Sequence, residues 1–154
     1  MAQLVDGPID AGTLMATFCA GRTDVGAVVS FTGLCRAATD GRAVETLTLD
    51  AWRGFTEEAM TALEDEARAR FDLIDLMAVH RWGEVRPGEA IVFVAAAATR
   101  RRTAFDAADF LMDQLKTRAP LWKREDGPDG RRWIEARASD HADAARWTDT
   151  ETNG

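Results

Sequence analysis

Apolar residues recur along this chain with two different periods, and this predicts a mixture of strands and helices. Residues 44–52 alternate between apolar and polar positions, as in a strand with one buried face. Residues 91–97 are apolar without interruption, which predicts a central strand buried on both faces. From residue 103 the apolar positions return at helical spacing, and Pro120 ends that helix because the residue before a proline avoids the α region.

The same reading assigns the rest of the chain. Thr56 is the predicted N-cap of a charged helix that ends near Arg70. Further elements are predicted as a helix at 10–20, strands at 26–34, 73–81, 120–125 and 132–137, and turns at 86–89 and 126–130. The order α-β-β-α-β-β-α-β-β predicts an α+β fold with mixed, mostly antiparallel sheets and flanking helices.

The length of 154 residues predicts one domain, residues 1–147, followed by a tail at 148–154. About the last dozen residues are polar and are predicted to be disordered. The longest uncharged apolar run, residues 90–98, is too short to span a membrane. No secretory signal is visible at the N-terminus, so a cytoplasmic location is predicted, with no membrane partner.

The charge of the chain argues against nucleic acid as a partner. The net charge is −7, yet residues 100–137 hold ten of the nineteen Lys and Arg residues. An acidic protein with one basic region suits a small anionic ligand better than a long polyanion. A solvated basic face is the alternative interpretation.

The two cysteines, Cys19 and Cys35, lack CxxC spacing, and the two histidines, His80 and His141, are isolated. No metal site is therefore predicted. Free thiols in a reducing compartment are the better interpretation, and a cysteine nucleophile remains an open alternative. The P-loop, GxGxxG, HExxH and GxSxG motifs are all missing, which argues against nucleotide binding, zinc proteolysis and serine hydrolysis.

The chain contains only two lysines, Lys116 and Lys123, against seventeen arginines. An arginine stays charged, whereas a lysine can lose its proton when it is desolvated or close to other cations. Two lysines seven residues apart therefore suggest amine chemistry, although two surface lysines retained by chance are an alternative.

The predicted elements can bring these two amines together. Lys116 lies about 80° from the centre of the apolar stripe of its helix, at the border of core and solvent. It could line a cleft, extend to solvent, or pair with Asp113. The turn at Pro120 can fold Lys123 back towards Lys116, on a strand face shared with Leu121. The alternative for Lys123 is the exposed face of an edge strand.

Three arginines lie close to the lysines in sequence, and they are Arg101, Arg118 and Arg124. Nearby cations and partial burial would lower the pKa of a lysine, and guanidinium groups bind phosphate or carboxylate through paired hydrogen bonds. This combination favours acyl or sulfur transfer that involves an anionic substrate.

Several segments together resemble the MoaE family, the catalytic subunits of molybdopterin synthase. The resemblance covers about residues 5–147, and the segment KTRAPLWKRE at 116–125 is its most specific part. The other matching segments are GAVVSFTG at 26–33 with Arg36, LTLDAW at 47–52, HRWGE at 80–84, PGEAIVFV at 87–94, Arg101 with 104–105, FLMDQL at 110–115 and WIEAR at 133–137.

The resemblance implies an α/β-hammerhead fold and a homodimer. Each subunit would bind a MoaD-type ubiquitin-like sulfur carrier, which gives a heterotetramer. The carrier's C-terminal thiocarboxylate would enter a pocket of this chain, and two sulfur transfers would convert cyclic pyranopterin monophosphate into the dithiolene molybdopterin, without a metal or redox cofactor.

The resemblance also implies roles for individual residues. Lys116 and Lys123 match the catalytic lysines, while Arg36, Arg101 and Arg137 match basic positions that bind the pterin phosphate and the tail. Arg100 stands where the family commonly has histidine, so it would take over or lose that role in substrate binding. The loop at 37–42 also lacks the family's usual asparagine and histidine, and tryptophan at 52 replaces the usual tyrosine.

Two other classes of function stay open. A relative that binds a ubiquitin-like tail without turnover would keep the docking surface and lose the chemistry. A small nucleic-acid-binding protein would use residues 100–137, which conflicts with the sequence pI of about 4.8.

Overall fold

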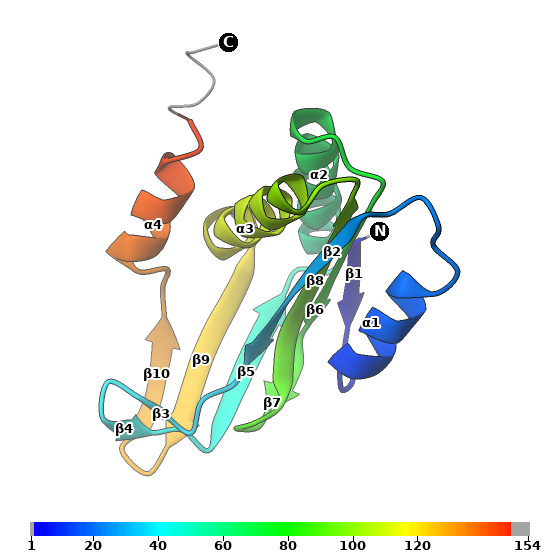
Figure 1. Cartoon of the computed structure of the whole chain (residues 1–154). Coiled ribbons are helices and arrows are strands. Elements are labelled where there is room, and N and C mark those ends of the chain that lie inside the picture. Colours follow the sequence, from blue (N-terminus) through cyan, green and yellow to red (C-terminus); the bar gives the residue numbers. More distant parts are fainter. Residues whose placement is uncertain (1, 149–154) are drawn as a thin grey trace.

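The computed structural model describes residues 2–148, which form two four-stranded sheets, a short hairpin and four helices (Figure 1). In spatial order the first sheet consists of β1 (Ala2–Val5), β6 (Asp75–Arg81), β8 (Ala90–Ala98) and β2 (Ala27–Leu34). The second consists of β10 (Gly130–Ile134), β9 (Leu121–Gly127), β5 (Thr46–Ala51) and β7 (Gly83–Val85). The hairpin is β3 (Ala38–Thr39) and β4 (Arg42–Ala43), and the helices are α1 (Ala11–Cys19), α2 (Phe55–Arg70), α3 (Arg101–Arg118) and α4 (Ala138–Ala145).

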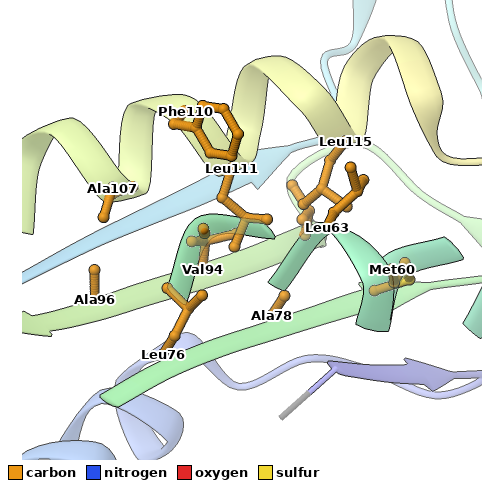
Figure 2. Packing of buried hydrophobic residues seen from close by; sticks show 13 residues of the cluster. Met60, Leu63, Leu76, Ala78, Val94, Ala96, Ala107, Phe110, Leu111 and Leu115 are labelled. Carbon is orange, nitrogen blue, oxygen red and sulfur yellow. The ribbon is translucent and has the colours of Figure 1, made fainter. Parts of the chain in front are cut away.

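The first sheet holds the main core. Helices α2 and α3 cover one face and α1 covers the other (Figure 1). Figure 2 shows Leu63 of α2, Leu111 and Leu115 of α3 and Val94 of β8 gathered between the two helices and the sheet. Residues 95–98 of β8 are alanines with no exposed surface, and their small side chains let helices approach both faces closely.

The second sheet is antiparallel throughout, and β9 lies in its interior, paired with β10 on one side and β5 on the other. Leu47, Leu49 and Val85 are buried on its inner face. Lys123 pairs with Leu49 of β5 and Ile134 of β10. The alternative that placed Lys123 on an edge strand is therefore wrong.

A buried threonine fixes the junction between the two sheets. The Thr56 hydroxyl accepts a hydrogen bond from the Trp52 amide at 3.1 Å and donates one to the Pro120 carbonyl at 2.8 Å. It thus joins the start of α2 to the turn between α3 and β9. This turn ends the helix that carries Lys116 and starts the strand that carries Lys123.

The α+β class and most predicted segments are confirmed, with corrections at their ends. Thr56 is not the N-cap of α2, because the helix begins at Phe55 after Gly54. The predicted strand 132–137 is the shorter β10 followed by α4. The predicted loop 37–42 contains the β3–β4 hairpin, and β1, β7 and α4 were not predicted either.

The prediction of disorder at the C-terminus is wrong for residues 143–147. Helix α4 extends to Ala145, and the Trp147 ring packs edge-on against Phe110 at 5.4 Å and Phe71 at 6.0 Å. An aromatic cluster of this kind anchors a terminal segment that has few apolar residues of its own. Of the predicted tail, residues 149–154 lie outside the described residues.

Candidate active site

Both lysines line the same cavity between the two sheets. Lys116 is exposed on the last turn of α3, and Lys123 is half-buried near the start of β9. The cavity has a volume of about 450 Å³ and is called the His80 cavity here after the buried histidine in its wall. Its charged or titratable lining residues are Arg36, His80, Lys116 and Lys123. The turn at Pro120 folds the second amine back towards the first, as the sequence predicted.

A second cavity adjoins the first and shares both lysines and Arg36. It has a volume of about 430 Å³ and is called the Arg137 cavity here. Arg137 enters it as the residue that precedes α4, and Asp140 enters it from the first turn of that helix. Four of the six predicted site residues, Arg36, Lys116, Lys123 and Arg137, therefore lie around one pair of cavities.

The environment of Lys123 lowers the pKa of its amine and so raises the neutral fraction. Burial lowers the pKa of Lys123 from 10.5 to about 8, and the Lys116 ammonium adds to this effect, while Asp140 opposes it. At pH 7 about one tenth of the Lys123 side chains would be neutral. The predicted lowering of a lysine pKa thus has a structural basis.

Two of the arginines that were expected to lower the pKa of Lys123 do not contribute to it. Arg118 binds Glu66 at 2.9 Å on the outer side of α3. Arg124 lies on the opposite face of β9 from Lys123, where it pairs with Asp126 at 3.2 Å. Sequence proximity was misleading here, because successive side chains of a strand point to opposite faces.

Asp113 is not the partner of Lys116. Its carboxylate accepts hydrogen bonds from Arg146 at 2.8 Å and from the Trp147 indole at 2.7 Å. These bonds attach the C-terminal segment to α3 and leave Lys116 directed to the cavities.

Arg101 and Arg100 lie at the other end of α3. Arg101 lines a third cavity of about 650 Å³, called the Arg101 cavity here, which runs along α3 and β2 and also reaches Lys116. Arg101 and Lys116 are fifteen residues apart on the helix, or about 22 Å along its axis. Arg100 precedes the helix, is exposed, and does not line any of these three cavities. Within the described part of the chain, Arg100 and Arg101 therefore do not lie beside the lysine pair.

The Arg137 cavity also contains Cys35, which is 5% exposed. Burial raises the pKa of the Cys35 thiol, and the carboxylates of Glu125 and Glu89 raise it further. A protonated thiol is a poor nucleophile at neutral pH. The environment of Cys35 therefore weighs against the cysteine nucleophile that the sequence left open.

Glu125 is fixed in the wall of the Arg137 cavity. Its carboxylate accepts hydrogen bonds from the Thr39 hydroxyl at 2.9 Å and from Arg132 at 3.0 Å. Sequence reasoning did not select Glu125, Asp140 or His80 as site residues. His80 and Glu125 lie within segments that resemble the MoaE family, and Asp140 lies in the first turn of a helix that was not predicted.

Within the described residues no group of three or more His, Cys, Asp or Glu side chains could hold a metal ion. In residues 2–148 no helix is both long and apolar enough to cross a membrane.

Comparison with known proteins identifies the family. The sequence profile described as "MoaE protein" matches residues 4–118. The chain belongs to the MoaE family. It is 54% identical to the molybdopterin synthase catalytic subunit of Caulobacter vibrioides over 147 residues, which cover 96% of this chain and 97% of the relative.

Two further comparisons agree with MoaE membership. The molybdopterin synthase catalytic subunit of Escherichia coli K12 is 50% identical over 126 residues, which cover 82% of this chain and 84% of the relative. The solved structure of the molybdopterin biosynthesis MoaE protein from Burkholderia ambifaria superposes with a TM-score of 0.81 at 37% identity, over 96% of this chain and 97% of that one. The fold described above is therefore the MoaE fold.

Proposed function

We propose that this MoaE protein is the catalytic subunit of a molybdopterin synthase and acts as a sulfurtransferase. It would transfer sulfur from the C-terminal thiocarboxylate of a MoaD-type ubiquitin-like carrier to cyclic pyranopterin monophosphate, forming the dithiolene of molybdopterin. The names of its relatives support this proposal. The observation that carries it is the meeting of Lys116, Lys123 and Arg36 at two adjoining cavities.

The charges of these cavities suit two anionic ligands. Lys116 is the proposed neighbour of the thiocarboxylate carbonyl, where it would assist proton transfer or stabilise the charge that develops on oxygen. Lys123, with a pKa of about 8, exchanges its proton close to neutral pH, so it would assist proton transfer or opening of the cyclic phosphate. Arg36 and Arg137 would bind the pterin phosphate and the tail.

A homodimer would explain the remote position of Arg100 and Arg101. Within residues 2–148 no strand pairs with the outer edge of β2, and Phe31 and Phe105 are exposed beside the Arg101 cavity. A second copy packed antiparallel along this cavity would bring its own Arg101 towards Lys116. With one carrier on each subunit, the assembly would be the heterotetramer that the family resemblance implies.

The proposed location is the cytoplasm. Cys19 and Cys35 are both free thiols, as expected in a reducing compartment.

Reconstitution tests the proposal. The purified protein, thiocarboxylated carrier and cyclic pyranopterin monophosphate should together yield the dithiolene product. Lys116→Arg should lower turnover at least a hundredfold and leave carrier binding within about threefold, because arginine keeps the charge but cannot act as a neutral amine. Arg118→Lys is the matched control on the outer side of the same helix and should keep full activity.

Two outcomes would reject the proposal. Carrier binding without any product from the wild-type protein would assign it to the non-catalytic class of tail-binding relatives. Turnover by Lys116→Arg close to that of the wild type would remove the amine role of Lys116.

A further inference from the structure

His80 lies in the wall of the cavity that holds both lysines, and its hydrogen bonding fixes its tautomer. The residue is on β6 and is 6% exposed. Its Nδ1 lies 2.9 Å from the carbonyl oxygen of Arg81. A carbonyl only accepts hydrogen bonds, so Nδ1 carries the proton, and in the neutral ring the lone pair is on Nε2.

The Nε2 atom of His80 is the ring nitrogen that remains available to a ligand. In the described part of the chain no hydrogen bond joins it to another protein atom. Among the described residues, the buried side-chain atoms that lack a hydrogen-bond partner do not include Nε2 of His80, so this atom keeps some solvent-accessible surface. Because His80 lines this cavity, its free acceptor faces the space beside Lys116 and Lys123.

The imidazole stays neutral at physiological pH. Burial lowers the pKa of His80 to about 4, the bond to the Arg81 carbonyl opposes this, and the charges of Lys123 and Lys116 lower it further. Fewer than about one ring in a hundred is then protonated at pH 7. The Nε2 atom of His80 therefore remains a hydrogen-bond acceptor at neutral pH, and His80 does not compete with Lys123 for protons.

The other polar side chains of this cavity are almost all donors. Among the described residues that line it, the charged groups are Arg36, Lys116 and Lys123, and the one hydroxyl is that of Thr32. The three cations can hold the anionic part of a ligand. An N–H group of the same ligand needs an acceptor, and the Nε2 atom of His80 supplies it without adding a charge.

We propose that His80 is a specificity-determining residue, whose Nε2 accepts a hydrogen bond from a ligand N–H group beside the anion that the two lysines hold. This inference rests on the proposed function and deepens it. The N–H group has two possible sources, a backbone amide of the carrier's C-terminal tail or a ring N–H of the pterin. A ligand without a donor at this point would leave Nε2 unpaired, which lowers its affinity.

Nitrogen NMR on the wild-type protein tests the contact directly. The chain has only two histidines, and His141 is exposed on α4, so it serves as an internal control. The protein labelled with ¹⁵N-histidine is titrated separately with unmodified carrier and with cyclic pyranopterin monophosphate, and binding of each is measured by calorimetry. We expect one ligand to shift the Nε2 resonance of His80, leaving its Nδ1 resonance and His141 in place. The ligand that causes the shift is the source of the N–H group.

Two variants give the functional arm. His80→Asn keeps an amide N–H near the position of Nδ1 and removes the acceptor, whereas His80→Gln places an amide group near Nε2. We expect His80→Asn to weaken binding of the donor ligand about tenfold and to raise its KM with little change in kcat. His80→Gln should stay within about threefold of the wild type, and the affinity for the other ligand should not change in either variant.

The outcomes separate this inference from the proposed function. If both ligands bind and turnover occurs, but neither ligand shifts the Nε2 resonance, the role of His80 is refuted and the sulfurtransferase proposal stands. Equal losses in His80→Asn and His80→Gln would also refute it, since that pattern indicates a structural role. If the wild-type protein binds neither ligand, the proposed function fails and this inference fails with it.

Discussion

Lys123 should lower the stability of the folded protein, and its replacement by methionine should therefore raise that stability. The pKa of Lys123 falls from 10.5 to about 8 on folding, chiefly because the amine is buried and next because of Lys116. One pKa unit corresponds to about 1.4 kcal/mol, so holding the ammonium in the folded state costs up to about 3 kcal/mol. Methionine has a similar length, fills the same space and carries no charge.

The pH dependence gives this prediction its sign. Below pH 8 Lys123 is protonated in both the folded and the unfolded protein, and the full cost applies. Between pH 8 and 10.5 the folded protein releases the proton first, so the wild type gains stability as the pH rises. Lys123→Met should be more stable than the wild type by up to about 3 kcal/mol at pH 7, and the difference should vanish near pH 10.5.

Urea unfolding at a fixed protein concentration, followed by tryptophan fluorescence at pH 7.0, 8.5 and 10.0, measures this difference. The matched control is Lys116→Met, which removes the same charge from an exposed side chain. The stability of Lys116→Met should still rise with pH above 8, but by less than that of the wild type, because Lys116 contributes to the pKa shift of Lys123. A Lys123→Met variant that is less stable at pH 7, or a difference that does not change with pH, would show that the environment of Lys123 does not disfavour its charge.

Three further changes test other parts of the structure. Arg137→Ala should weaken binding of cyclic pyranopterin monophosphate about tenfold and carrier binding less; equal effects in separate titrations would contradict this role. Thr56→Val removes both hydrogen bonds of a buried hydroxyl, including the one to the Pro120 carbonyl, and should lower the free energy of unfolding by about 2 kcal/mol in urea titrations, whereas a loss below 0.5 kcal/mol would contradict it. Gly127→Ala would place its Cβ about 2.2 Å from the Ala43 carbonyl oxygen and should lower the melting temperature by several degrees. An unchanged melting temperature would show that the β3–β4 hairpin shifts to make room for the Cβ at no cost in stability.

The sequence by itself determined the elements that bury a continuous apolar pattern. The run at 91–97 became β8, and the helical spacing after residue 103 became α3, because each pattern has only one way to bury its apolar side chains. The sequence also singled out the two lysines, since their rarity is visible without any structure. The proline between them indicated the turn that brings them together.

Tertiary structure decided the features that depend on distant neighbours. Helix α4 has no buried residue of its own, so no helical spacing of apolar residues predicted it. The apolar contact that anchors this segment is made by Trp147, which follows the helix. The pKa of Lys123 depends on burial and on Lys116 and Asp140, which come from other elements, and the adjacent arginines point away. His80 looked isolated in the sequence and meets the lysines only because β6 lies beside β8 in the first sheet. Local patterns fix what a segment becomes, while the surroundings of a charged group are set by the packing of the whole chain.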